Sequence, residues 1–349
     1  MMRNKRDIKS MLPAELEEYF SIVGERAYRA EQVFRWLHSG AAAFCEMTNL
    51  PETLREKLNG EFYITAPEIV DKQASQSDGS TKYLWRLSDG SEIESVVMEH
   101  DYGNTVCVST QVGCRMGCVF CASTQGGLVR NLAASEILDQ VLFSGKELGE
   151  KLSNVVLMGI GEPLDNFSNV TQFLKIVTHP SGICVGARHI SLSTCGIIEN
   201  IDKLADYDIQ LTLTVSLHAP DDETRSLLMP INRANGVGKL LDTCGEYFLK
   251  TGRRISYEYA MIEGVNDTHR HAEELARKLK KTGSHVNLIP LSKIAESPLK
   301  ASSSENVRMF AEYLMKNGIN VTIRRSLGGD ISASCGQLRS RHKCQNNRQ

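Results

Sequence analysis

Residues 111–121 read Gln-Val-Gly-Cys-Arg-Met-Gly-Cys-Val-Phe-Cys. Cys114, Cys118 and Cys121 have a C-x3-C-x2-C spacing, which supplies three thiolates to a four-iron cluster and leaves the fourth iron without a protein ligand. Closely spaced cysteines also bind zinc, and Cys107 or Cys335 would then be the fourth ligand. The spacing alone favours the cluster over zinc.

Two features near these cysteines favour the cluster further. Phe120 directly precedes the third cysteine, and a Gly-Glu-Pro element at residues 161–163 follows the next apolar strand. With the cysteine spacing, both features resemble the radical S-adenosylmethionine superfamily. The resemblance implies that the open iron binds the amino and carboxylate groups of S-adenosylmethionine and passes one electron to its sulfonium. It also implies that the backbone of the Gly-Glu-Pro element meets the amino group of this cofactor.

Composition indicates an ordinary soluble protein. With 349 residues, 41% hydrophobic and 23% charged, the chain can bury a full-size core, and we expect one large and one smaller domain. No stretch approaches about 18 uninterrupted apolar residues, and the first residues lack the apolar region of a secretion signal. Ten cysteines spread through a chain of this size indicate reduced thiols with one metal site. We therefore expect a cytoplasmic protein with no membrane partner.

The net charge of −2 does not by itself indicate a nucleic-acid partner. Local basic runs occur at residues 5–9, at Arg324 and Arg325, and in residues 339–349. A solvated surface explains each run equally well. Binding of RNA would therefore depend on local patches rather than on the overall charge.

The chain divides into four segments by pattern. Residues 1–60 have helical periodicity without a strand and predict a small helical module. Residues 61–103 contain short β-rich runs separated by Asp-Gly turns, and predict two or three strands that join the module to the main domain. Residues 104–338 alternate apolar strands with amphipathic helices, and residues 339–349 form a basic tail.

The alternation after residue 104 predicts parallel βα units, and hence an α/β barrel or open barrel. The expected strands are residues 105–109, 155–159, 190–193, 211–217, 255–261, 286–291 and 319–323. The expected helices are residues 135–148, 170–178, 237–249, 267–281 and 303–316.

Polar and sulfur-containing side chains follow the strands of this pattern. The three cysteines at 114–121 follow the first strand, Gly161 and Glu162 the second, and Ser193 the third. Residues 216–218 follow the fourth strand and Ser292 follows the sixth. Because parallel strands of a barrel end at one rim, we expect these groups to converge there.

Six segments make the resemblance more specific. They are Val-Cys-Val-Ser-Thr-Gln-Val-Gly-Cys at 106–114, Met-Gly-Ile-Gly-Glu-Pro-Leu at 158–164, Ser-Leu-His-Ala at 216–219, Met-Pro-Ile-Asn at 229–232, Val-Asn-Leu-Ile-Pro at 286–290 and Ala-Ser-Cys-Gly-Gln-Leu at 333–338. Over nearly the whole chain they resemble the RlmN family of dual-specificity RNA adenine methyltransferases. This resemblance implies a partial, TIM-like (βα)6 radical S-adenosylmethionine barrel with an N-terminal helical accessory domain, which we expect to contact RNA.

The resemblance further implies methylation of carbon 2 of an adenine in the peptidyl-transferase region of 23S rRNA and, in dual-specificity members, of an adenine beside the anticodon of tRNA. Carbon 2 lies between two electron-withdrawing nitrogens and cannot attack a sulfonium methyl group. In the family one S-adenosylmethionine therefore methylates a cysteine thiolate, which corresponds to Cys335, and a second is cleaved at the cluster. The 5′-deoxyadenosyl radical then removes a hydrogen from that methyl group, and the carbon radical adds to the adenine.

The resemblance also implies which two residues release the resulting protein–RNA adduct. Cys107 corresponds to the resolving thiol that attacks the sulfur of Cys335 and leaves a disulfide for cellular reductants. Glu94 matches the proposed acceptor of the ring proton, although a single Glu in a polar β-segment is usually a surface residue.

The resemblance also implies the cofactor contacts. These are Gly161, Glu162, Ser193, Ser216, Leu217, His218 and a position after the sixth strand where the family's usual Asn is replaced by Ser292. A serine hydroxyl is shorter than an asparagine amide, and it would contact the cofactor directly or through water. Outside the resemblance, His218 would be a core histidine and Ser193 a strand-end hydroxyl. A flavodoxin or ferredoxin electron donor and a monomeric state complete these expectations.

Three other functions fit parts of the pattern. The related Cfr type uses the same two cysteines to methylate carbon 8 of the same ribosomal adenine, but Pro163 and the region around Pro290 favour the RlmN type. A non-catalytic RNA-binding protein with a structural zinc would not need Cys335. A radical enzyme that acts on a small metabolite would not need the pair of Cys107 and Cys335.

Overall fold

The fold is described from a computed structural model that covers residues 5–280, 282–292, 297–325 and 327–331. Cys335 and the predicted basic tail at 339–349 lie outside these described residues. Among the described residues, none of the helices has the length and apolar character needed to cross a membrane.

A curved sheet of ten strands forms the centre of the molecule, in the order β14-β13-β12-β11-β10-β9-β6-β5-β4-β3. Its parallel part consists of β6 (Thr105–Cys107), β9 (Asn154–Leu157), β10 (Ile190–Thr194), β11 (Thr212–Ser216), β12 (Ser256–Met261), β13 (His285–Pro290) and β14 (Asn320–Ile323). The expected α/β class and open parallel barrel are therefore confirmed.

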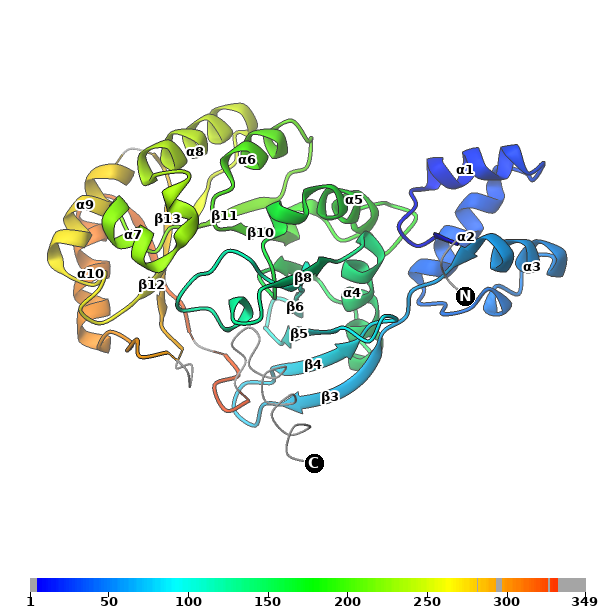
Figure 1. Ribbon diagram of the computed structural model, residues 1–349, viewed down its shortest axis with the longest axis horizontal. Coiled ribbons are helices and arrows are strands. Elements are labelled where there is room, and N and C mark those ends of the chain that lie inside the picture. Colours follow the sequence, from blue (N-terminus) through cyan, green and yellow to red (C-terminus); the bar gives the residue numbers. More distant parts are fainter. Residues whose placement is uncertain (1–4, 281, 293–296, 326, 332–349) are drawn as a thin grey trace.

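Helices connect the parallel strands and lie around the outside of the sheet (Figure 1). They are α4 (Ala134–Leu148), α5 (Phe167–Val177), α6 (Ile198–Ala205), α7 (Asp222–Leu228), α8 (Val237–Thr251), α9 (His269–Leu279) and α10 (Ser304–Lys316). The longer helices α4, α5, α8, α9 and α10 bury apolar residues at the 3.6-residue period. The sequence pattern did not predict α6 or α7, because eight and seven residues are too short for a clear period.

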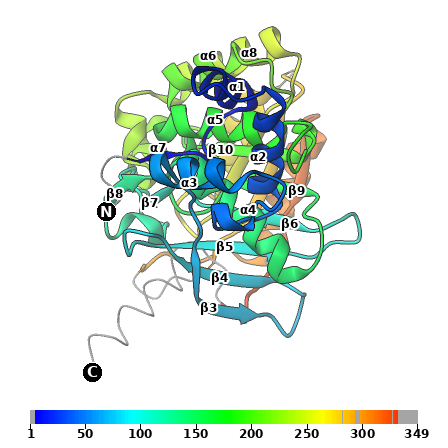
Figure 2. The ribbon, with the colours of Figure 1, turned by 90° about the vertical axis from the view of Figure 1, so that its right-hand side faces the viewer.

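Three antiparallel strands extend the sheet beyond β6. They are β3 (Glu68–Ala74), β4 (Thr81–Arg86) and β5 (Glu92–Met98). Figure 2 shows them below the barrel strands. β5 pairs with β6, so the β-rich extension continues the barrel wall instead of forming a separate sheet.

The N-terminal helices α1 (Pro13–Ile22), α2 (Tyr28–His38) and α3 (Glu52–Glu61) lie to one side of the barrel (Figure 1). Contrary to the expectation of a region without strands, β1 (Arg6–Asp7) pairs in parallel with β2 (Phe62–Tyr63). Two-residue strands are too short to produce an alternating pattern. The pair brings the two ends of this region together.

A buried ion pair joins the N-terminal region to the barrel. The Lys9 ammonium lies 2.7 Å from the Asp139 carboxylate of α4, and both side chains are almost completely buried. Burial raises the pKa of Asp139 to about 6, although the Lys9 charge opposes the rise. Ser135, at the start of α4, donates a hydrogen bond to Asp7. The N-terminal region is thus fixed to the barrel by buried polar contacts and by a shared apolar core.

Replacing Lys9 with methionine is expected to lower the free energy of unfolding by about 3–5 kcal/mol, because it leaves the Asp139 carboxylate buried without its cation. Denaturant unfolding measures this loss. The paired Lys9→Met/Asp139→Leu variant removes both charges and is expected to recover most of the stability. A single Lys9→Met variant as stable as the parent would contradict the structural role of this pair.

Candidate active site

The cysteines lie on a loop between two short strands, β7 (Gln111–Gly113) and β8 (Leu128–Asn131), which the sequence pattern did not predict. Gly113 has φ +76, and a Cβ there would lie 2.0 Å from the carbonyl oxygen of Gly127. The Cys114 amide donates to that same oxygen at 3.0 Å. Glycine at 113 is therefore required for the chain to enter the loop.

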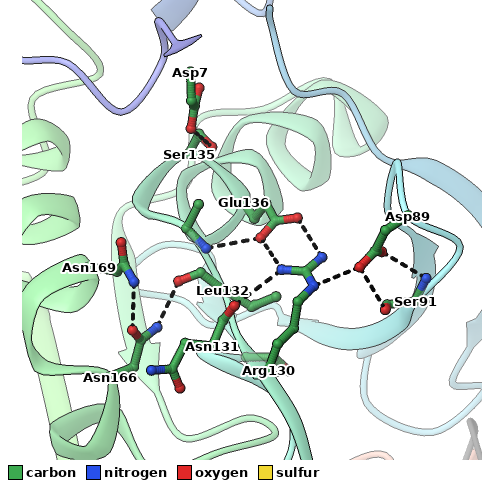
Figure 3. Close-up of polar contacts among 12 residues, drawn as sticks. Asp7, Asp89, Ser91, Arg130, Asn131, Leu132, Ser135, Glu136, Asn166 and Asn169 are labelled. Carbon is green, nitrogen blue, oxygen red and sulfur yellow. Dashed lines mark hydrogen bonds and ion pairs between the residues drawn. The ribbon is translucent and has the colours of Figure 1, made fainter. Parts of the chain in front are cut away.

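Arg130 fixes the base of this loop (Figure 3). Its guanidinium donates to both carboxylate oxygens of Glu136, at 2.7 and 2.8 Å, and to Asp89 at 2.7 Å. Arg130 in turn lowers the pKa of Asp89 to about 2. Glu136 is in the first turn of α4 and Asp89 lies between β4 and β5. One side chain thus joins the cysteine loop, α4 and the β-extension.

A cavity of about 350 Å³ lies at the carboxyl ends of the parallel strands. The predicted site residues that line it are Cys114, Cys118, Cys121, Gly161, Glu162, Ser193, Ser216, His218 and Ser292. The expected convergence on one rim is therefore observed for these nine residues. Leu217 is buried away from the cavity, and its amide donates to the Glu258 carbonyl at 3.0 Å.

Two of the three cysteine thiols in this cavity, Cys114 and Cys118, have raised pKa values. Burial is the largest cause of the raised pKa of Cys118, and negative charge on Cys121 and Cys114 raises this pKa further. Burial also raises the pKa of Cys114 to about 11. Within the described part of the chain, no three His, Cys, Asp or Glu side chains are grouped as ligands of a single metal ion. In a four-iron cluster each thiolate binds a different iron, and three thiols around one cavity fit that arrangement.

The Glu162 carboxylate forms hydrogen bonds with the backbone that follows two neighbouring strands, β9 and β10. It accepts hydrogen bonds from the Leu164 amide at 3.0 Å and from the Cys195 amide at 2.7 Å. Its pKa is raised by burial, against the effect of these hydrogen bonds. Gly161 has φ +107, and a Cβ there would lie 2.6 Å from the Gln111 side chain. The side chain of Glu162 is thus engaged within the protein, and its backbone amide donates to the Gln111 side chain at 2.9 Å.

His218 is a neutral donor that faces the cavity. Burial lowers its pKa to about 3. Its Nδ1 accepts the Ala260 amide at 2.9 Å, so the single ring proton is on Nε2. The Phe120 ring packs edge-on against the imidazole, with centroids 4.7 Å apart. The ring orientation and the tautomer are therefore both fixed.

Arg225 was not predicted from the sequence, yet it organises the same strand ends. It is 1% exposed and donates to the carbonyl oxygens of Leu217, Cys195 and Ser216 at 3.0, 2.7 and 3.1 Å. Asn232 accepts a further hydrogen bond from it at 2.9 Å. A buried arginine has no sequence signal of its own, although Asn232 belongs to the Met-Pro-Ile-Asn segment quoted above.

Glu258 and Arg324 also line the cavity and were not predicted to do so. Glu258 is on β12, where its carboxylate accepts the Asn287 amide at 2.9 Å and lies 3.5 Å from the Arg324 guanidinium. Burial raises the pKa of Glu258, and Arg324 opposes that rise. In the sequence Arg324 stood out only as one member of a local basic run.

Glu94 and Cys107 point to the same face of the sheet. Val96 on β5 pairs with Cys107 on β6, and cross-strand partners share a face. Glu94 is two residues before Val96 and therefore also shares this face. Its side chain is buried, with 4% exposed, whereas a single Glu in a β-segment is usually on the surface. Burial raises the pKa of Cys107, and charge on Glu94 adds to the rise, as expected for neighbouring groups.

Comparison with known proteins agrees with this geometry. A family model described as "Radical SAM superfamily" matches residues 108–279, and one described as "Ribosomal RNA large subunit methyltransferase N-terminal domain" matches residues 7–64. The chain is 47% identical over 344 residues to a Desulforamulus reducens protein described as "Probable dual-specificity RNA methyltransferase RlmN", covering 98% of each chain. A Clostridium tetani protein of the same description is 46% identical over 348 residues, covering 100% of both.

A solved structure is similar over nearly its whole length. The radical SAM methyltransferase from Sphaerobacter thermophilus superimposes with a TM-score of 0.90 at 42% identity, covering 95% of this chain and 98% of that chain.

Proposed function

The chain belongs to the RlmN family of dual-specificity RNA methyltransferases within the radical S-adenosylmethionine superfamily, and from this premise we propose that it methylates carbon 2 of an adenine in 23S rRNA and of an adenine beside the anticodon of tRNA. The observation that carries the proposal is the placement of Glu94 and Cys107 on one face of the sheet, beside strands whose ends form the cofactor cavity. Transfer through a protein thiol needs these two groups near each other.

Superfamily membership implies a four-iron cluster and S-adenosylmethionine, and the cavity residues fit both. Cys114, Cys118 and Cys121 would hold the cluster. The bound pair supplies a 5′-deoxyadenosyl radical. The backbone at Gly161, the hydroxyls of Ser193 and Ser216, and the Nε2–H of His218 would bind and orient the cofactor. Ser292 is exposed at the mouth of the cavity and would bind it less directly.

Three side chains would carry the transfer to RNA. Cys335 takes the methyl group from one S-adenosylmethionine, and a second is consumed to produce the radical. Glu94 accepts the proton that carbon 2 of the adenine loses, and the adduct also gives up one electron, which balances the single electron consumed in producing the radical. The Cys107 thiolate then attacks the sulfur of Cys335, which releases the methylated RNA and leaves a Cys107–Cys335 disulfide. Electrons from a flavodoxin or ferredoxin and a monomeric enzyme complete the proposal.

Mass spectrometry of nucleosides from both RNAs, after incubation with reconstituted enzyme, tests the function. We expect 2-methyladenosine in 23S rRNA and in tRNA. Appearance of 8-methyladenosine would instead assign the Cfr type of reaction. Absence of any methylated adenosine, together with normal cleavage of S-adenosylmethionine, would refute RNA methylation.

We propose that residues 1–60 contact the RNA outside the barrel, supported by the family-model match at 7–64. Between residues 5 and 64, ten acidic residues outnumber eight basic ones, so individual exposed cations rather than the net charge would bind phosphates. Deleting the region is an unsuitable test, because it removes Lys9 and leaves Asp139 unpaired.

The exposed Arg26 offers a milder test. Arg26→Glu is expected to weaken RNA binding about threefold to tenfold and to reduce the salt dependence of binding, while cleavage of S-adenosylmethionine is unchanged. Fluorescence anisotropy with tRNA at several salt concentrations measures this effect. Equal affinity and equal salt dependence would argue against a phosphate contact at this residue.

A further inference from the structure

Cys107 faces the interior of the barrel beside two charged side chains. In the sheet it pairs with Val96 of β5 on one side and with Val156 of β9 on the other. Lys82 of β4 pairs in turn with Val96, so its side chain shares the face of Cys107 and Glu94. Lys82 is fully buried. The sheet register therefore places a cation and a carboxylate on the face that carries the resolving thiol.

Arg324 approaches the same region from the last strand of the sheet. Its amide donates to the Leu288 carbonyl at 2.9 Å, which continues the pairing of β14 with β13, and its guanidinium lies 3.5 Å from Glu258. Besides the cofactor cavity, Arg324 lines a second cavity of about 710 Å³ together with Thr105 and Val156.

Those two neighbours locate Arg324 relative to Cys107. Thr105 is two residues before Cys107 on β6 and shares its face, and Val156 is the cross-strand partner of Cys107. The free edges of the sheet are β14 and β3, and the second cavity is lined by residues of both β14 and β6. Arg324 thus lines both the cofactor cavity and a cavity that is also lined by the neighbours of Cys107 on β6 and β9.

We propose that Arg324, held by Glu258, is the cation that stabilises the Cys107 thiolate when this thiolate resolves the protein–RNA adduct. The inference rests on the proposed function. In this step a Cys107–Cys335 S–S bond forms and the S–C bond to the RNA breaks. The electron pair goes to the departing carbon, which takes a proton and becomes the methyl group. A dithiol reductant later supplies two electrons and two protons to the disulfide.

The charges around Cys107 explain why such a cation is needed. Burial raises the pKa of Cys107 to about 11, and the Glu94 charge adds to the rise. Arg324, Lys82 and the Met158 amide act in the opposite direction. At pH 8 only about one thiol in a thousand would be ionised at such a pKa. The rate at which Cys107 releases the adduct is therefore expected to rise about tenfold per pH unit from pH 7 to 9. Loss of one cation should lower this rate over the whole of that range.

Arg324→Gln tests the proposal, with Arg324→Lys and Arg325→Gln as matched variants. Iodoacetamide labelling of reduced, cluster-loaded protein, quantified on the Cys107 peptide, reports on the thiolate without RNA. We expect Arg324→Gln to slow labelling at pH 8 about tenfold and to shift the labelling profile about one unit upward. Arg324→Lys keeps the charge and should retain most of the rate. Arg325 lines the second cavity too but is not among the cations that act on Cys107, so Arg325→Gln should behave like the parent protein.

A single-turnover reaction then measures the decay of the protein–RNA adduct. In Arg324→Gln, decay at pH 8 is expected to slow about tenfold and to recover at higher pH, whereas adduct formation is unchanged. Unchanged labelling and unchanged decay would overturn the role of Arg324. If the parent protein forms no adduct while Arg324→Gln still slows labelling, the proposed reaction fails but the interaction of Arg324 with Cys107 stands.

Discussion

Cys107→Ala is expected to trap the protein on its RNA. Without the resolving thiolate, methylation of Cys335 and addition to the adenine still proceed, but no group remains to attack the sulfur of Cys335. Turnover should fall by at least roughly a thousandfold, while a covalent protein–RNA species accumulates to about one equivalent. A denaturing gel with radiolabelled tRNA detects the species, and ribonuclease digestion should return its mobility to that of the free protein.

Cys335→Ala and Cys45→Ala complete this experiment. Cys335→Ala removes the proposed methyl carrier and should give neither product nor adduct. Cys45 is an exposed cysteine of the N-terminal region, and its replacement by alanine should leave turnover and gel mobility unchanged. Normal turnover in Cys107→Ala or in Cys335→Ala would contradict the two-thiol scheme.

Cys118→Ala is expected to abolish cleavage of S-adenosylmethionine while the fold persists. Cys118 is on the loop between β7 and β8 and packs in a small cluster with Cys195, Leu228, Met229 and Ile262. Removing one sulfur there should cost only about 1 kcal/mol of stability, whereas a four-iron cluster loses one of its three protein ligands. We expect loss of most bound iron and labile sulfide, and at least roughly a thousandfold less 5′-deoxyadenosine with dithionite.

Cys244→Ala is the matched control for that variant. Cys244 is buried on α8 and is absent from the lining of the cofactor cavity among the described residues. Its replacement should change stability by a similar amount and leave the iron content intact. A Cys118→Ala protein that keeps its iron and cleaves S-adenosylmethionine normally would remove the basis of the cluster assignment.

Periodicity was sufficient for the long elements of this protein. The predicted helix at 303–316 is Ser304–Lys316, and the predicted strand at 255–261 is Ser256–Met261. Long amphipathic helices and buried parallel strands repeat their apolar residues often enough to be recognised. The two-residue strands β1 and β2, the β7–β8 hairpin and the short helices α6 and α7 contain too few residues for such a pattern, and tertiary contacts determine them instead.

Residues of the site were predictable where they belong to contiguous motifs. The cysteines at 114–121 and the pair Gly161 and Glu162 were identified in this way, and the structure brings them into one cavity. Arg225, Glu258 and Arg324 were missed, because each acts from a position whose local sequence is ordinary. The fold alone makes Arg225 a buried donor to three strand-end carbonyls and places Arg324 beside Glu258.

The family, the cysteine motif proposed to hold the cluster and the α/β class follow from the linear chain, because motif spacing and hydrophobic period are local properties that need no third dimension. The electrostatic environment of Cys107 and Glu94 depends on the folded state. Their facing directions are set by the register of β5 on β6, and the neighbouring cations come from β4 and from the end of β14. Charge interactions depend on distance in space, and residues 82, 94, 107 and 324 become neighbours only when the sheet curves and brings its two ends together.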